Sequence, residues 1–147
     1  MRGPVYGTER AEYGVGAVKV KVKDILADVD LKNPNDVPVE TKYGWLTVVE
    51  KQLLDECMLT HELSEDELQK AASMYAMEQV GDEYVLLAQP PYHDLYVQWV
   101  NAQIALVNLD NDAYANYQTL FNNALLTFKN YFNRTHRARI GGPKFLF

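Results

Sequence analysis

The sequence predicts an all-α fold of four helices, with a long antiparallel helix hairpin near its C-terminal end and an extended arm at each end. Apolar residues recur every three or four positions over most of the chain, which is the period of one face of an α-helix. Glycine and proline gather near the two ends and between the periodic stretches, where they favour turns and extended backbone. We therefore divide the chain into an N-terminal arm (1–17), a helical domain (18–137) and a C-terminal docking tail (138–147).

The composition is that of one globular domain. The 147 residues are 48% hydrophobic and 23% charged, and this length buries a core without metal or disulfide staples. The single cysteine, Cys57, has no internal disulfide partner, and residues 1–16 lack the apolar run of a signal peptide. No apolar segment approaches the ~20 residues that span a bilayer. We therefore expect folding in a reducing aqueous compartment, with no membrane partner.

The N-terminal third mixes extended and helical patterns. Valines alternate with lysines over residues 18–23, which indicates a strand, and the apolar spacing then becomes that of a short helix over 22–31. Pro34 ends this helix, because the residue before a proline is pushed out of helical backbone. Pro38 suits the first turn of a second helix, which the apolar spacing extends over residues 39–59.

The middle of the chain predicts one further helix and an extended run. Ser64 is a natural helix cap, and Glu67 three residues later completes the reciprocal capping pattern of a helix over 64–77. Residues 84–87 are an apolar extended run, and the two prolines at 90–91 stop it.

The clearest pattern lies in the C-terminal half. Apolar and aromatic residues follow spacings of three and four over residues 95–109 and again over 114–135. Asn108, Asp110 and Asn111 between them supply turn and cap chemistry. Two helices joined by so short a link fold back as an antiparallel hairpin. The residues expected in the core are Trp45, Leu53, Leu95, Trp99, Leu106, Tyr117, Phe121 and Phe128.

Charge is distributed unevenly along the chain. The net charge of −6 argues against a general nucleic-acid binder. No Lys or Arg occurs between Lys70 and Lys129, whereas residues 133–147 hold four cations and no acid. A basic tail on an acidic body is typical of an interaction arm, and a merely solvated tail has the same composition. The residues expected to bind a partner are Arg134, Arg137, Arg139, Lys144, Phe145, Leu146 and Phe147.

No group of residues predicts catalysis, so we expect a protein that is not an enzyme and has no cofactor or metal. Cys57 and His61 stand at i and i+4 of the second expected helix, a spacing that two metal ligands use. A buried thiol and a histidine near the helix C-terminus explain the same pair. A metal-dependent enzyme using Cys57 and His61 is therefore one alternative function. A small regulatory DNA-binding protein that uses the basic end of the last helix is another.

Eight short blocks, taken in order, carry a family resemblance. The blocks are Asn33–Asn35, which resembles the turn into the second helix, and Lys42–Leu46, Val49–Glu50, Leu59–Glu62, Pro90–Tyr96, Tyr114–Tyr117, Leu120–Asn122 and Tyr131–His136. They resemble the second, third and fourth helices of small head-to-tail adaptor proteins of tailed bacteriophages, and the resemblance covers residues 18–137. The helical stretch from Ser64 to Gln79 and the two arms depart from the family pattern.

The resemblance implies a four-helix adaptor-type bundle in a virion structural protein. Such a protein forms a ring, expected to be a dodecamer, that docks under the portal ring at the capsid vertex and meets a tail, stopper or terminator protein below. The resemblance further implies assembly in the host cytoplasm and double-stranded DNA passing through the ring without sequence-specific binding. The cation-free stretch 71–128 fits a channel lining, since like charge prevents adhesion of DNA, and it fits a solvated face equally well.

Overall fold

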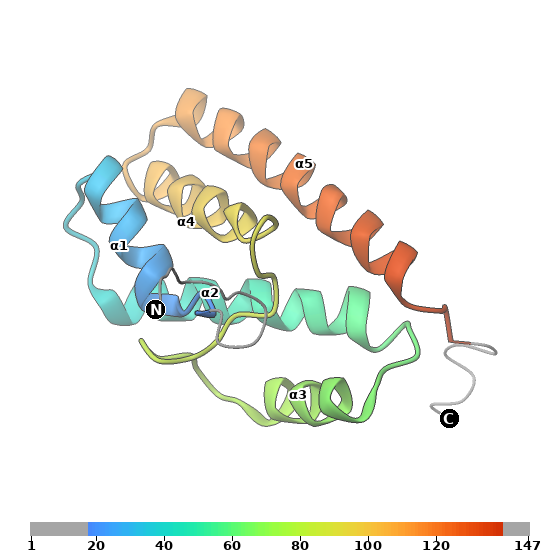
Figure 1. The fold of residues 1–147 in the computed structure, drawn as a ribbon. Coiled ribbons are helices and arrows are strands. Elements are labelled where there is room, and N and C mark those ends of the chain that lie inside the picture. Colours follow the sequence, from blue (N-terminus) through green and yellow to red (C-terminus); the bar gives the residue numbers. More distant parts are fainter. Residues whose placement is uncertain (1–17, 140–147) are drawn as a thin grey trace, which may run out of the picture.

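The computed structural model describes residues 18–139, and these residues form five α-helices (Figure 1). The elements are α1 (Val22–Lys32), α2 (Val39–Leu53), the π-helix η2 (Leu54–Met58), α3 (Glu65–Ala76), α4 (Asp94–Val107) and α5 (Asn111–Thr135). The all-α class is confirmed. Each of the five helical stretches described in the sequence forms an α-helix, so the expected total of four helices was one too few. The short helix before Asn33 is a full element of 11 residues that packs against α2 and α4.

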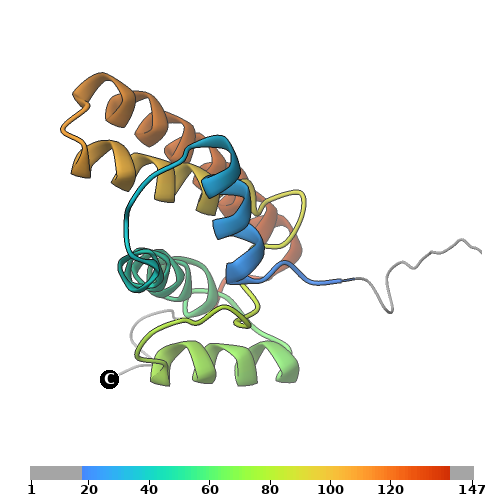
Figure 2. The same ribbon diagram turned by 90° about the vertical axis from the view of Figure 1, so that its left-hand side faces the viewer.

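The helices are arranged around α2. In Figures 1 and 2, α3 lies on one side of α2, and α4 and α5 lie on the other. α1 crosses beside α2 and α4 and covers both. The core lies between α1, α2, η2, α4, α5 and the segment that joins α3 to α4, and α3 adds Ala71 and Met74 to it. No helix of residues 18–139 combines the length and apolar character needed to cross a membrane.

The segment before α1 does not form the expected strand. Within the described range only Lys21 pairs, as a single antiparallel bridge with Val85. Val22 already begins α1, its side chain is fully buried, and its N–H donates to the Tyr84 carbonyl at 3.0 Å. The alternation over residues 18–23 did not produce a strand, because α1 begins at Val22, directly after the single bridge at Lys21.

The second helix ends at Met58, within one residue of its expected end at 59, but it is α-helical only as far as Leu53. It continues as η2, whose hydrogen bonds span one residue more than those of an α-helix. The buried face of α2 includes Leu46, Val49 and Leu53, and Trp45 packs half-buried at its edge. The Trp99 indole N–H donates to the Trp45 carbonyl at 2.8 Å, which ties α2 to α4.

α3 begins where its capping pattern predicts. The Ser64 hydroxyl accepts a hydrogen bond from the Glu67 N–H at 3.2 Å, and the Glu67 carboxylate accepts one from the Ser64 N–H at 2.9 Å. The reciprocal cap is thereby confirmed. The acidic first turn of α3 also suits the positive end of the helix dipole.

α4 and α5 lie side by side and run in opposite directions (Figure 1). The Trp99 and Phe121 rings lie 5.0 Å apart between them, and Leu95 and Phe128 are buried nearer the other end. Leu106 was expected in this core and is instead 48% exposed. The reason is that α1 and α2 bury a second face of α4, so the last turn of α4 turns Ile104 and Ala105 inward. Tyr117, another expected core residue, is half-buried.

Candidate partner-binding site at the C-terminal end of α5

The cations predicted to bind a partner lie at and beyond the end of α5. Arg134 is exposed on the last turn of α5, where a cation suits the negative end of the helix dipole. Arg137 is exposed and Arg139 is half-buried in the segment that follows. The other predicted residues lie outside the described range; they are Lys144, Phe145, Leu146 and Phe147.

The backbone that follows α5 is held against the turn that follows η2. The Glu62 N–H donates to the Arg137 carbonyl at 2.8 Å, and the Arg139 N–H donates to the Thr60 carbonyl at 3.1 Å. Backbone pairing of this kind is independent of side-chain identity, so the sequence pattern does not reveal it. The two hydrogen bonds hold the last described residues against the helical body.

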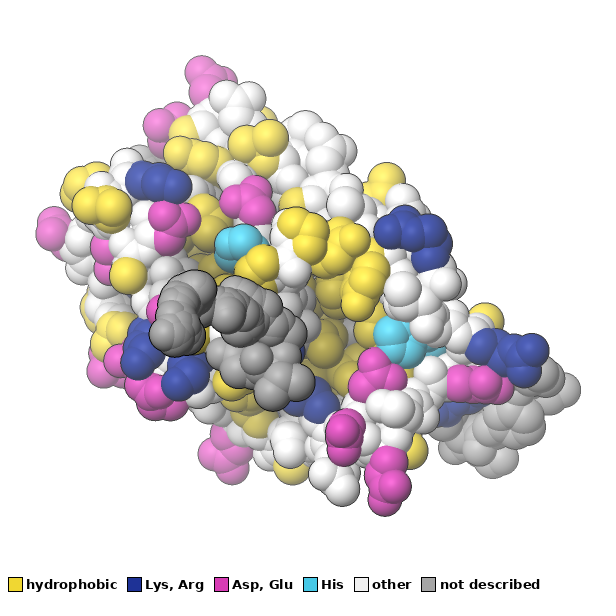
Figure 3. Space-filling model, in the orientation of Figure 1, with side chains coloured by type: hydrophobic (Ala, Val, Ile, Leu, Met, Phe, Trp, Pro, Cys, Tyr) yellow, Lys and Arg dark blue, Asp and Glu magenta, His cyan; other side chains and the backbone are white. Residues whose placement is uncertain are grey.

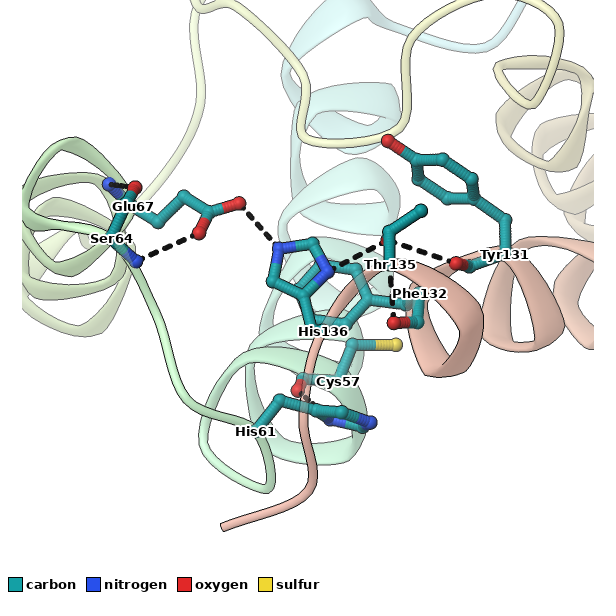
Figure 4. Close-up of polar contacts among 8 residues, drawn as sticks. All are labelled: Cys57, His61, Ser64, Glu67, Tyr131, Phe132, Thr135 and His136. Carbon is teal, nitrogen blue, oxygen red and sulfur yellow. Dashed lines mark hydrogen bonds and ion pairs between the residues drawn. The ribbon is translucent and has the colours of Figure 1, made fainter.

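His136 anchors the same end of α5 through its ring (Figure 4). The ring stacks on Phe132, with centroids 3.8 Å apart and 5° between the planes. Its Nε2 lies 2.6 Å from a carboxylate oxygen of Glu67, which joins the end of α5 to the start of α3. Burial raises the pKa of Glu67, but the hydrogen bonds from His136 and Ser64 outweigh it and hold that pKa below its ordinary value.

Cys57 and His61 are close together but face different partners (Figure 4). Cys57 lies in η2, and His61 lies beyond the end of the helix rather than on it, so the expected i, i+4 helical pair was wrong. The His61 Nδ1 is 2.7 Å from the Cys57 carbonyl oxygen, and its Nε2 is 2.8 Å from the Asn133 side-chain oxygen. The thiol is buried, and burial raises the pKa of Cys57 to about 11. Within residues 18–139 no three His, Cys, Asp or Glu side chains are grouped to hold a metal ion.

Acidic side chains share this end of the molecule with the cations. Glu62 is exposed directly beside the paired backbone, and Glu65 and Asp66 are exposed on the first turn of α3. Figure 3 shows dark blue and magenta side chains next to one another at this end of the body. A mixed surface attracts duplex phosphates less than a uniformly basic one does.

A second group of interacting side chains surrounds Glu50, which sequence analysis did not single out. Its carboxylate is fully buried and accepts hydrogen bonds from the Tyr84 hydroxyl at 2.8 Å, the Leu87 N–H at 3.1 Å and the Tyr96 hydroxyl. Burial raises the pKa of Glu50, and the three hydrogen bonds oppose that effect without cancelling it. The only sequence signal is an acid within the apolar face of α2. Every donor comes from the fold itself, so the cluster holds the segment before α4 in place.

The described geometry brings part of the predicted binding site together. Arg137 and Arg139 flank one backbone pairing, and Arg134 lies one turn earlier on α5. No family model, curated protein or solved structure matches this chain. Fold and site therefore define an all-α protein in which residues 137–139 are held by backbone pairing at a mixed-charge end of the helical body.

Proposed function

We propose that the chain is a virion structural protein, a head-to-tail adaptor whose ring docks under the portal and links the DNA-filled capsid to the tail. The observation that carries this proposal is the backbone pairing that fixes Arg137 and Arg139 at the end of the described chain. The residues that follow include Lys144 and the apolar run Phe145–Phe147. An apolar and basic segment that starts from an anchored point is well suited to bind a neighbouring protein.

The rigidity of the helical body supports the same function. Aromatic rings join the second half of α5 to the segment before α4: the Tyr92 ring stacks on Tyr131 with centroids 4.6 Å apart and lies 5.9 Å from the Phe128 ring. Subunits of a ring repeat one contact, so each needs two different complementary surfaces held at a fixed angle. A long helix whose aromatic side chains pack against the rest of the molecule provides that rigidity.

Charge supports a place beside DNA. The stretch from residue 71 to residue 128, which contains α4 and most of α5, has no Lys or Arg. In the proposed ring this stretch lines the channel, where like charge keeps passing DNA from adhering. The mixed charge around Arg137 and Glu62 suits contact with protein better than contact with duplex.

The test is binding to portal rings of the protein encoded in the same genome. We expect the full chain to dock and to form a ring with a central channel in electron micrographs. Replacing residues 144–147 by a Gly-Ser segment of equal length abolishes docking and leaves the helical circular dichroism unchanged. The adaptor function is wrong if the full chain neither docks nor forms a ring. Tight, salt-sensitive retention of duplex DNA would instead favour a regulatory DNA-binding protein.

A further inference from the structure

The link between α4 and α5 carries an exposed leucine in an unfavourable backbone conformation. Leu109 has a φ of 58°, in the left-handed region that bulky side chains seldom adopt. Its N–H bonds to the Leu106 carbonyl at 3.1 Å, and the Asp110 N–H bonds to the Ala105 carbonyl at 2.9 Å, as in a Schellman helix end. Glycine is the usual residue at this position. The Leu109 side chain is 84% exposed, so packing within residues 18–139 does not account for it.

Leu109 belongs to an apolar surface at this end of the molecule. We define the link surface as Leu106, Val107 and Leu109 together with the cavity beside them. Val107 is 57% exposed and lines a cavity of about 510 Å³, whose other wall is the loop from Pro34 to Pro38. This volume exceeds that of an aromatic side chain. The link surface therefore offers both an exposed apolar ridge and a place for a large side chain to enter.

The rim of the link surface is acidic. Asp36 lines the cavity, and Asp110 and Asp112 are exposed at the start of α5. The lysines on the neighbouring helices are engaged with other acids: Lys32 with Asp28 at 3.0 Å, and Lys42 with Asp30 at 2.8 Å. The opposite end of α5 has the complementary chemistry, since Lys144 and Phe145–Phe147 follow the arginines there.

Geometry prevents the two ends of one chain from meeting. α5 has 25 residues, so at 1.5 Å per residue it separates the link from its C-terminal end by about 37 Å. The eight residues 140–147 span about 29 Å at most when fully extended. Figure 1 shows the link at one end of α5 and residues 136–139 at the other. Phe147 therefore cannot reach the link surface of its own chain.

We propose that the link surface of one copy binds the Phe145–Phe147 segment of a second copy. One phenylalanine enters the cavity beside Val107, the other packs on Leu109, and Lys144 faces the acidic rim. The proposal rests on the ring proposed above and assigns residues 144–147 to the contact between adjacent subunits, so that loss of this segment prevents docking by preventing ring formation. Donor and acceptor surfaces differ, so the contact is heterologous and repeats from copy to copy around a ring.

Crosslinking of mixed single-cysteine variants tests the contact. In a Cys57→Ala background, we mix a size-tagged Val107→Cys chain with a Pro143→Cys chain, with and without portal rings, and add a short bismaleimide. Pro143 adjoins the proposed contact, so both phenylalanines are kept. We expect a covalent dimer of the two different chains. Leu126→Cys is the matched control, because Leu126 has the same 57% exposure on α5 away from the link. A yield with Val107→Cys no higher than with Leu126→Cys overturns the proposal.

Leu109→Gly, introduced into the Val107→Cys chain, keeps the backbone geometry and removes the side chain. We expect it to lower the crosslinking yield at least tenfold, and an unchanged yield overturns the role of Leu109. The two proposals fail separately. A wild-type chain that docks on portal rings without the crosslink overturns the contact and leaves the adaptor function standing. Efficient crosslinking without docking overturns the adaptor function and leaves the contact standing.

Discussion

Glu50 accepts a hydrogen bond from the hydroxyl of Tyr96, and both side chains are fully buried between α2 and α4. The same hydroxyl accepts a hydrogen bond from the Ala88 N–H at 2.9 Å. The pair therefore joins two helices and the loop before α4 through one buried carboxylate. A buried carboxylate is tolerated only when donors satisfy it, and this network explains why an acid stands in the apolar face of α2.

Glu50→Ala is expected to lower the free energy of unfolding by about 3 kcal/mol, because buried donors on Tyr84, Leu87 and Tyr96 lose their acceptor. Urea unfolding followed by circular dichroism measures the change. Glu56→Ala is the control on the same helical segment: Glu56 forms a partly exposed ion pair with Lys129 at 2.7 Å, so its loss is expected to cost less than about 1 kcal/mol. Equal losses in the two variants would contradict a structural role for Glu50.

Glu50 also makes stability depend on pH. Burial raises its pKa above the ordinary value of 4.5, so the folded chain keeps this proton to higher pH than the unfolded chain does. The contribution of Glu50 to stability is therefore full below pH 4.5 and falls as the pH rises toward the folded pKa. In Glu50→Gln this titration is absent. We expect the stability of the wild type relative to Glu50→Gln to decrease from pH 4.5 upward, and parallel pH profiles would show that the carboxyl is not perturbed.

Leu109→Gly is expected to raise the free energy of unfolding by about 0.5–1 kcal/mol, because relief of the left-handed strain exceeds the added entropy of the unfolded chain. The exposed side chain contributes little burial that could be lost. Leu120→Gly is the matched comparison: Leu120 is 48% exposed within α5, where glycine costs about 1 kcal/mol. The midpoint temperature of unfolding should therefore rise in Leu109→Gly and fall in Leu120→Gly. A lower midpoint in Leu109→Gly would show that the backbone at Leu109 is not strained. If Leu109→Gly is more stable than the wild type but crosslinks less, the wild-type leucine favours binding at the expense of stability.

Local patterns predicted much of the fold because local interactions determine it. Ser64 and Glu67 complete a cap with each other, so four residues of sequence suffice to place the start of α3. The apolar periodicity also predicted α1 correctly, because its four buried residues lie on one face: Val22, Ile25, Leu26 and Val29. Leu106 shows the limit of such patterns. Its burial depends on which neighbours cover α4, and periodicity in one helix does not specify its neighbours.

The predicted site was only partly accessible to sequence reasoning. The position of Arg134 follows from the end of a periodic helix, and charge counting was enough to find it. The backbone pairing of Arg137 and Arg139 involves Glu62 and Thr60, more than 70 positions earlier in the chain, and no side-chain pattern encodes it. Glu50 and Leu109 were missed because each departs from a local rule. An acid in an apolar face and a leucine at a glycine position become meaningful only when the surroundings are known.

Cys57 is expected to react slowly with iodoacetamide in the folded chain. Its side chain is 1% exposed, and burial raises its pKa to about 11, so about one thiol in a thousand is ionised at pH 8. Reaction in denaturant should be at least about 100-fold faster, because unfolding removes both the burial and the shift of the pKa. Mass spectrometry of the alkylated chain measures both rates. A Val107→Cys chain provides an exposed thiol for comparison, and equal native rates at the two positions would contradict burial of Cys57.

His136 and Glu67 hold the end of α5 on α3, and this contact is expected to weaken in acid. Hydrogen bonds hold the pKa of Glu67 below 4.5 despite its burial, so its contribution is full above pH 4.5 and is lost as the pH falls through the folded pKa. Glu67 is 34% exposed in its side chain, so the contribution is below about 1 kcal/mol.

Glu67→Gln keeps a residue suited to the capping position of α3 and removes the charge. We expect the stability difference between the wild type and Glu67→Gln to be constant above pH 4.5 and to shrink below it. Glu65→Gln changes an exposed acid of the same turn, and its difference from the wild type should stay near zero. A pH-independent difference for Glu67→Gln would mean that its carboxylate is not what the His136 ring binds. The end of α5 would then rest on the Phe132 stack and the backbone pairing alone.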